Sequence, residues 1–460
     1  MGYCKACIEK DLKIEELKEQ VKSLQAKLMY RQRKEKEGYF GASTPSSKIP
    51  FKKNSSEEKT KNKGGGVPGH KGHGRPAHTE ETADTIIACA VGDTCPDCGG
   101  ALTVKKTQNR TVIESAPAKP ESILYRLAVK ECKHCHKTFR AKAPSVLPKS
   151  LYGNQITSRV AIMHYVHGIP MGRISEMTGV SIGSLIHLFH RLARSFTPLM
   201  DALIRTYRQE PVRHADETGW RNDGQSGYAW LFCTAALSIF LFKNTRSSLI
   251  PKGVFGIEYL PGFLVVDRYS AYNKAPCKIQ YCYAHLLRDV EKLARDGPDD
   301  PEVIHFTGIL IPLLASAMHL ASKDIADTEY YRLAGKLKKK IIAVCQSPAH
   351  HLGIRAMQDI FIDHEDRLFH WVDDRRVPAD NNRAERDLRP TVIARKVSFG
   401  SSSDAGAETR SILMSVLHTL NKRRGKESLE SVFKGILDEI VTNPSVDLAP
   451  LVLRKQTGTP

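Results

Sequence analysis

The sequence predicts an α+β protein built from several domains. Three observations carry this prediction: an apolar seam at helical spacing within residues 1–40, two Cys-x-x-Cys pairs further along, and short apolar runs followed by a long, mostly helical stretch. The chain of 460 residues is long enough for three or four domains, each able to bury its own core.

Residues 1–40 predict a coiled-coil helix. Apolar side chains recur there every three or four residues among charged ones, which gives a narrow apolar seam. We expect a homodimer or a larger assembly through this seam. A single amphipathic helix packed on its own domain is the alternative, because barely three heptads are present. The seam consists of Ile14, Leu17, Val21, Leu24 and Leu28.

Residues 41–84 predict a basic, flexible linker, because they lack an apolar period and are rich in lysine and glycine. Lys71 and Arg75 are candidate DNA contacts, since the glycines around them allow a close approach to phosphates or a minor groove. A solvated tether without a fixed partner is the competing interpretation. The net charge of +19 favours an anionic partner but does not distinguish DNA from other polyanions.

Two Cys-x-x-Cys pairs predict a zinc-ribbon domain over residues 85–143. Four thiolates in two such pairs surround Zn²⁺ tetrahedrally. Strands at 111–114 and 124–130 are expected to bring the pairs together across an unusually long separation. Reduced cysteines without metal are the alternative, and His134 and His136 are competing ligands. The expected ligands are Cys95, Cys98, Cys132 and Cys135.

Residues 150–208 predict a helix-turn-helix-like helical domain. The sequence around Gly179 has the pattern of a helix, a glycine turn and a second helix that begins at Ser181. A plain helical hairpin would show the same apolar periods. In the second helix we expect Ser184, His187 and Arg191 to face DNA, and Ile182, Leu185, Ile186 and Phe189 to pack inward.

Three acidic residues in the second half of the chain have neighbours suited to a divalent metal site. Asp216 and Asp267 each follow a short apolar run, so both are expected at strand ends. Glu385 lies in a predicted helix that Pro390 should stop or kink. Mg²⁺ prefers oxygen ligands and takes one or two carboxylates per ion, so three carboxylates can hold a metal pair. A lone aspartate at a strand end is otherwise a turn or cap residue.

Further elements are expected around these acids. The apolar runs 228–233, 237–242 and 263–267 predict neighbouring strands. A helical insertion is expected at about 284–374, because the chain between Asp267 and Glu385 is longer than a compact fold requires. Residues 411–460 predict a C-terminal helical segment with a loose tail from Leu448.

Four short sequences closely resemble the family 66 bacterial insertion-sequence transposases, and the resemblance covers nearly the entire chain. They are HADETGW at 214–220, VVDRYSAYN at 265–273, CYAHLLRD at 282–289 and NNRAERDLRP at 381–390. The resemblance implies a ribonuclease-H-like DDE catalytic domain over residues 209–410. It also implies a zinc-binding domain where the cysteine pairs lie.

Asp216, Asp267 and Glu385 fall on the first, second and third acidic positions of that family. Asp267 is followed by Arg268 where related transposases often carry glycine, and Asp289 is the less favoured second acid. Cys282 and His285 match a Cys-x-x-His pair of the family. As a lone pair they cannot complete a zinc site, and a core cysteine beside a helix-capping histidine is an equal alternative.

The resulting expectation is a cytoplasmic transposase that binds terminal inverted repeats and target DNA, with two Mg²⁺ ions for cleavage and strand transfer and Zn²⁺ in the ribbon. Arg383, Arg386 and Arg395 are candidate phosphate contacts, and transposon-encoded accessory proteins are possible partners. No membrane segment is expected, because the apolar stretch 229–242 is too short. A zinc and helix-turn-helix regulator with an inactive domain, or a structure-selective nuclease, are the alternatives.

Overall fold

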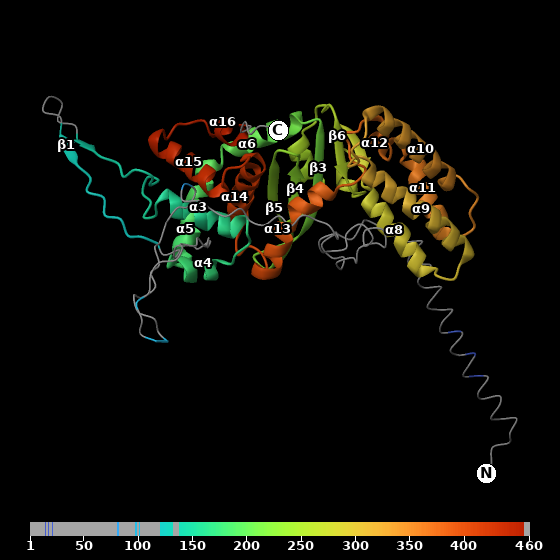
Figure 1. The fold of residues 1–460 in the computed structure, drawn as a ribbon, viewed down its shortest axis with the longest axis horizontal. Coiled ribbons are helices and arrows are strands. Elements are labelled where there is room, and N and C mark those ends of the chain that lie inside the picture. The colour runs from blue at the N-terminus through green and yellow to red at the C-terminus, as the bar shows by residue number, and fades with distance from the viewer. Residues whose placement is uncertain are drawn as a thin grey trace, which may run out of the picture. The chain divides into compact units, whose positions relative to one another are not determined.

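The computed structural model describes residues 120–131 and 138–454, together with the isolated positions 14, 17, 21, 81, 97, 98 and 101. The chain divides into two compact units, Met1–Ile49 with Pro120–Pro460, and Pro50–Lys119. The architecture below is that of the first unit (Figure 1). Three seam positions, Ile14, Leu17 and Val21, are helical and exposed. Leu24, Leu28, Lys71, Arg75, Cys95, Cys132 and Cys135 lie outside the described residues.

A mixed five-stranded sheet lies at the centre of the described chain. Strands β3, β4 and β5 pair antiparallel, and β6 and β7 run parallel to β3. Their spatial order is β5-β4-β3-β6-β7. The three predicted apolar runs are strands, although β6 pairs with β3 and not with β5. The strands are β3 (Val212–Asn222), β4 (Gln225–Cys233), β5 (Ser238–Lys243), β6 (Phe263–Val266) and β7 (Lys278–Tyr281).

The position of Asp216 differs from the prediction of a strand end. Asp216 lies inside β3, which continues to Asn222 before it turns into β4. The prediction was wrong because the polar residues that follow, Glu217 and Thr218, are buried strand residues. Asp267, by contrast, directly follows the last residue of β6, as predicted.

Four helices precede the sheet: α3 (Asn154–Tyr165), α4 (Met171–Thr178), α5 (Ile182–Phe196) and α6 (Leu199–Gln209). Gly179 ends α4 in the left-handed conformation with φ of 69°, which glycine adopts without steric cost. The Ser181 side chain caps α5 by accepting a hydrogen bond from the Ser184 N–H. The predicted helix, glycine turn and capped second helix are therefore present.

The inward face of α5 is narrower than predicted. Leu185 and Phe189 are buried, but Ile182 is 47% exposed and Ile186 is 39% exposed. These two isoleucines share the exposed side of α5 with His187. The prediction that they pack inward was wrong.

The expected helical stretch between β7 and Glu385 is present. It contains α8 (Tyr283–Asp296), α9 (Pro301–Leu320), α10 (Asp327–Cys345), α11 (Leu352–Asp363), the 3-10 turn η3 (Glu365–Arg367) and α12 (His370–Asp373). Helix α9 packs against α8 and α10. By length and composition α9 could also cross a membrane, a test that core helices pass as well. The sequence analysis included this segment in the helical insertion but did not note its apolar length.

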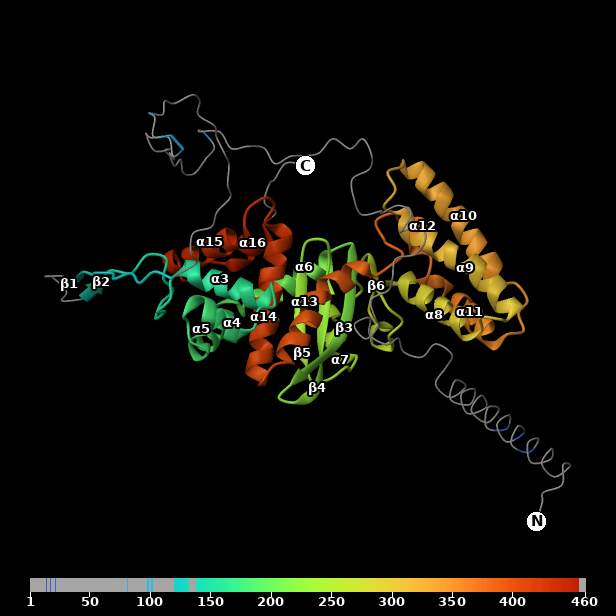
Figure 2. The same ribbon diagram turned by 60° about the horizontal axis from the view of Figure 1, so that its bottom comes forward.

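Helix α13 (Asn382–Ser398) carries Glu385 and packs against β3 and β4 (Figure 2). Pro390 does not stop it, since the helix continues for two more turns beyond that residue. A proline inside a helix removes one backbone donor and strains one turn. The contacts of α13 with the sheet offset that local loss.

Helix α14 (Asp404–Arg423) covers the edge strand β5. Three hydroxyl groups spaced four residues apart on α14 accept hydrogen bonds from the backbone N–H groups of β5. The donors Phe242, Phe240 and Ser238 meet Ser411, Ser415 and Thr419 at 3.1, 2.8 and 3.1 Å. The helix thus satisfies an edge that would otherwise present unpaired backbone groups.

The C-terminal region ends in ordered helices. Helix α15 (Leu429–Thr442) packs against α3 and α14, and α16 (Leu448–Leu453) packs against α6 and α14. Val452 is fully buried, and the Asp447 side chain caps α16. The prediction of a loose tail from Leu448 was therefore wrong for residues 448–453.

Two short strands flank the second cysteine pair. Strand β1 (Val129–Glu131) pairs antiparallel with β2 (Thr138–Arg140), so Cys132 and Cys135 fall between them in the chain. The predicted strand at 124–130 begins only at Val129. Its expected partner at 111–114 lies outside the described residues.

Candidate functional site

The pairing of β3 with β6 brings two of the three predicted acids together. Val212 pairs with Phe263 and His214 pairs with Val265 in a parallel register. The pairing ends there, and an extension of the same register by two residues would set Asp216 beside Asp267. Neighbouring strands lie about 4.8 Å apart, and paired residues face the same side of a sheet. The topology therefore places both carboxylates at one position on the sheet.

Glu385 reaches this position from α13. Burial raises the pKa of Asp216 well above its usual value, and the negative charges of Glu217, Asp267 and Glu385 raise it further. Such an effect between carboxylates requires that they lie close together. Asp216 Oδ1 accepts a hydrogen bond from the Glu217 N–H at 2.8 Å. Asp216 Oδ2 is buried and has no hydrogen-bond partner among the described residues.

Asp267 is held in a tight turn at the end of β6, where its Oδ1 accepts from the Tyr269 N–H at 2.9 Å. The neighbouring Arg268 forms an ion pair with Asp289 on α8. Asp289, the alternative second acid, is therefore committed to an arginine. Asp267 is among the charges that raise the pKa of Asp216, which supports Asp267 over Asp289 as the acid near Asp216.

A fourth acid, Glu217, is buried next to the site and was not singled out in the sequence. Arg246 Nη2 donates to Glu217 Oε1 at 2.5 Å, and the Tyr272 hydroxyl donates to Glu217 Oε2 at 2.6 Å. Burial and the charge of Asp267 raise the pKa of Glu217. Because adjacent strand residues face opposite sides, Glu217 and its partners support the far side of β3. Its position directly after Asp216 was the only signal in the sequence.

Helix α8 contributes a cation and a histidine to the site. Arg288 Nη2 donates to Glu385 Oε1 at 2.8 Å and to Oε2 at 3.0 Å. Arg288 Nη1 lies 3.2 Å from His285 Nε2, and burial lowers the pKa of His285. A neutral His285 accepts from Arg288 through Nε2. The second member of the Cys-x-x-His pair thus lies beside the third acid.

Cys282, the first member of that pair, joins the strand ends to the helix of Glu385. Its backbone N–H donates to Val266 O at 2.9 Å, directly before Asp267. Its sulfur accepts from the Asn381 N–H at 3.1 Å. The pair is therefore split in function: Cys282 is a buried structural contact, and His285 borders the acids. His285 is not the helix cap considered from the sequence, because that position at the start of α8 belongs to Cys282.

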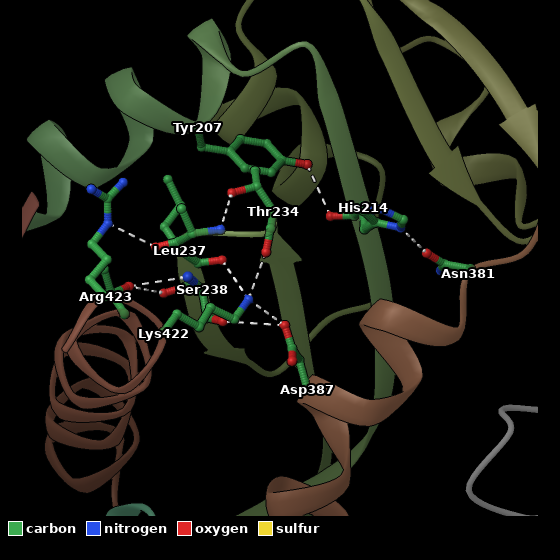
Figure 3. Close-up of polar contacts among 11 residues, drawn as sticks. Tyr207, His214, Thr234, Leu237, Ser238, Asn381, Asp387, Lys422 and Arg423 are labelled. Atoms are coloured by element: carbon green, nitrogen blue, oxygen red, sulfur yellow. Dashed lines mark hydrogen bonds and ion pairs between the residues drawn. The ribbon is translucent and has the colours of Figure 1, made fainter. Parts of the chain in front are cut away.

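Asn381 fastens the beginning of α13 to β3 (Figure 3). Its Oδ1 accepts from His214 Nδ1 at 2.9 Å, and its Nδ2 donates to Ala215 O at 2.8 Å. Asn381 is 1% exposed. The sequence analysis did not predict the role of Asn381, because no sequence pattern distinguishes a buried, hydrogen-bonded asparagine from an exposed one.

Further along α13, two more residues hold the helix to the rest of the fold. Asp387 Oδ2 accepts from Lys422 Nζ of α14 at 2.5 Å, and the same Nζ donates to Leu237 O at 2.9 Å (Figure 3). Arg395 Nη1 donates to Gly219 O of β3 at 2.7 Å. Glu385 lies between Asn381 and Asp387, so its backbone is attached on both sides.

The predicted DNA contacts differ in their surroundings. Arg386 is exposed and Arg383 is half-buried, whereas Arg395 is engaged with β3 as described. On α5, His187 is exposed and Ser184 is half-buried. Arg191 donates to the Lys149 and Pro148 carbonyls, which ties α5 to the segment that enters α3. Of the described candidates, Arg386 and His187 are the most accessible.

No group of three or more histidine, cysteine or acidic side chains is arranged to hold a metal among the described residues. Both Glu385 oxygens accept hydrogen bonds from Arg288. Of the four predicted zinc ligands only Cys98 is described, and it is exposed.

The chain matches a family of transposases over more than half of its length. A family model described as the IS66 family of transposases matches residues 149–409. The chain therefore belongs to the IS66 transposase family, which confirms the resemblance found in the four sequence strings. A second model, described as the zinc-finger binding domain of the IS66 transposase, matches residues 93–136. That range contains all four predicted cysteine ligands and supports Zn²⁺ as their metal.

Two proteins of Sinorhizobium fredii are similar to this chain over most of their length. The uncharacterized protein y4jD is 21% identical over 369 residues, which cover 71% of this chain and 70% of that protein. The uncharacterized protein y4qI is 22% identical over 414 residues, with 78% and 72% covered. Neither name describes an activity.

Proposed function

We propose that the protein is a DDE transposase that cuts DNA at the ends of an insertion sequence and joins the exposed 3′ hydroxyls to target DNA. Asp216, Asp267 and Glu385 are the catalytic acids and would hold two Mg²⁺ ions. Two observations support the proposal: the β3 and β6 register runs toward both aspartates, and the charges of Asp267 and Glu385 raise the pKa of Asp216.

The donor set fits a hard divalent cation. Carboxylate oxygens are the protein ligands that Mg²⁺ prefers. Asp216 Oδ2 is a buried acceptor without a hydrogen-bond partner among the described residues, and buried polar atoms are otherwise almost always satisfied. A cation would also offset the repulsion between the acids. Bound divalent ions supply Lewis-acid stabilisation for in-line displacement at phosphorus.

The sheet supports a catalytic domain of ribonuclease H type. An antiparallel meander of three strands is extended by two strands parallel to the first, in the order β5-β4-β3-β6-β7. The acids come from the first strand, from the end of the fourth, and from a helix packed against β3 and β4. Helices α8 to α12 form an insertion between the second and third acids.

The protein's own residues would position and grip the DNA. Arg383, Arg386 and Arg395 on α13 are proposed phosphate contacts, as are Lys71 and Arg75 in the linker. Ser184, His187 and Arg191 on α5 are proposed contacts of a helix-turn-helix. The exposed His187 and Arg386 are the first to test. The zinc finger, a coiled-coil dimer and transposon-encoded accessory proteins complete the proposed synaptic assembly in the bacterial cytoplasm.

The test is a cleavage and strand-transfer assay with DNA of the element's ends in the presence of Mg²⁺. Wild type should give nicked ends and joined products. Asp267→Ala and Glu385→Ala should abolish both, while the exposed Asp299→Ala should leave both unchanged. Unaltered joining by the two active-site variants would refute the assignment. Cleavage without joining would point to a nuclease, and DNA binding without either product would point to a regulator.

A further inference from the structure

Arg288 forms an ion pair with Glu385, the proposed third catalytic acid, in this structure. One of its nitrogens lies 2.8 and 3.0 Å from the two Glu385 oxygens. The Arg288 side chain is 28% exposed and that of Glu385 is 18% exposed. The ion pair is thus half-buried but remains within reach of solvent and of a ligand that enters the site.

A metal ion and Arg288 compete for the same two oxygens. While both oxygens accept hydrogen bonds from the guanidinium, Glu385 has fewer lone pairs to offer a cation. A divalent ion and a guanidinium are also both positive, so each raises the cost of the other nearby. Without metal, Arg288 offsets the repulsion between Glu385 and the two aspartates. With metal bound, this compensation is no longer required.

Arg288 donates to the carboxylate of Glu385. Its other hydrogen bond in the described chain is to His285, a buried residue that takes no negative charge. A guanidinium binds phosphate in the same way as it binds carboxylate, through charge-assisted hydrogen bonds to two oxygens. A phosphate of DNA held against the acids would therefore be a matching acceptor for the displaced arginine.

We infer that Arg288 exchanges Glu385 for a DNA phosphate, so that binding of DNA completes the metal site. This inference rests on the proposed function. Because a DNA phosphate offers Arg288 another anion to bind, metal affinity increases when DNA is bound. By thermodynamic reciprocity, metal increases DNA affinity by the same factor, typically about 5- to 150-fold. This exchange would keep the metal site from filling completely when no DNA is bound.

The experiment measures Mn²⁺ binding to the full chain by electron paramagnetic resonance, with and without a duplex that carries a pre-cleaved element end. Wild type should bind Mn²⁺ at least about fivefold more tightly with the duplex. Arg288→Gln should bind Mn²⁺ more tightly than wild type without DNA, and the duplex should then have no further effect. Arg288→Lys, which keeps a mobile cation, should retain the coupling.

Two controls give the result its meaning. Glu385→Gln should lose the coupling, which separates it from Mn²⁺ bound to the duplex alone. Arg332→Gln, at an exposed ion pair with Glu329 on α10, should behave as wild type. If Arg288→Gln and wild type respond alike to the duplex, the exchange is overturned although the metal site stands. If Asp216→Asn binds Mn²⁺ as wild type does, the proposed metal site itself fails.

Discussion

The backbone N–H of Asn381 donates to the sulfur of Cys282 at 3.1 Å, and this bond joins the start of α13 to the end of the parallel strands. Cys282 in turn donates its own N–H to Val266, the residue before Asp267. The Asn381 side chain reaches His214 and Ala215 on β3. One buried asparagine thus connects the three elements that carry the proposed catalytic acids.

Asn381→Ala should therefore destabilise the fold and loosen the site. The substitution leaves Ala215 O and His214 Nδ1 buried without their partner, at a cost of about 1–3 kcal/mol. We expect a lower melting temperature by calorimetry and a weaker affinity for Mn²⁺. Asn443→Ala is the matched control: it removes only an exposed hydrogen bond from the Ser445 N–H, so it should lower the melting temperature much less and leave Mn²⁺ binding unchanged. An Asn381 variant with normal stability and normal Mn²⁺ binding would show that the connection is dispensable.

Asp216→Asn should make the metal-free protein more stable at neutral pH. Burial and neighbouring acids raise the pKa of Asp216, so its charged form is unfavourable in the folded state. The isosteric amide removes that charge, and its oxygen can still accept from the Glu217 N–H. Thermal unfolding at pH 7 in a chelator should show a higher midpoint for the variant. Added Mn²⁺ should then stabilise wild type more than the variant. A lower midpoint in the chelator would contradict this account of the charges.

Gly262→Ala should destabilise the protein by more than about 1 kcal/mol. Gly262 precedes β6 with φ of 90°, and a Cβ there would overlap the Pro211 carbonyl before β3. The close approach sets the start of the pairing that brings Asp267 beside Asp216. Gly335→Ala in α10 is the control, because its surroundings are open and alanine favours a helix by up to about 1 kcal/mol. Equal melting temperatures for the two variants would argue against a constrained turn at Gly262.

The protein should lose stability as the pH falls below about 6.5, and His164 is one cause. Burial, and next the charge of Arg410, lowers the pKa of His164 to about 3. Arg410 Nη2 donates to His164 Nε2 at 2.9 Å, which requires a neutral imidazole. Because the unfolded chain has the higher pKa, the stabilisation is complete above that value and is lost as the pH falls toward the folded pKa.

This pH dependence can be assigned by substitution. His164→Gln keeps an acceptor for Arg410 but does not titrate, so its melting temperature should fall less between pH 7 and pH 5 than that of wild type. The exposed His350→Gln should follow the wild-type curve. If His164→Gln and wild type lose stability in parallel, the acid sensitivity arises elsewhere.

Much of the framework could be predicted from local sequence. The apolar runs identified β4, β5 and β6, and the glycine and serine around α5 identified its turn and cap. Asp267 was correctly placed, because an abrupt change from apolar to polar residues marks the end of β6. Asp216 was misplaced at a strand end, since a buried polar strand has the same appearance as a loop.

The contacts that assemble the site could not be predicted. Arg288 and Glu385 are far apart in the chain, and the sequence around either residue does not indicate that the two are in contact. Cys282 precedes α8 and Asn381 precedes α13, and their roles depend on how the fold brings the starts of these two helices together. The helix α16 was missed because its stability comes from packing against α6 and α14, which local composition does not reveal.

The central claim is that Asp216, Asp267 and Glu385 share a divalent metal site at one position of the sheet. Anomalous diffraction from crystals of the full chain, grown with Mn²⁺ and a duplex of the element's end, tests it most directly. The account predicts a strong manganese peak in contact with Asp216 and Asp267, with Glu385 turned toward the metal and Arg288 on a phosphate. The absence of manganese at these carboxylates, with DNA bound, would contradict it.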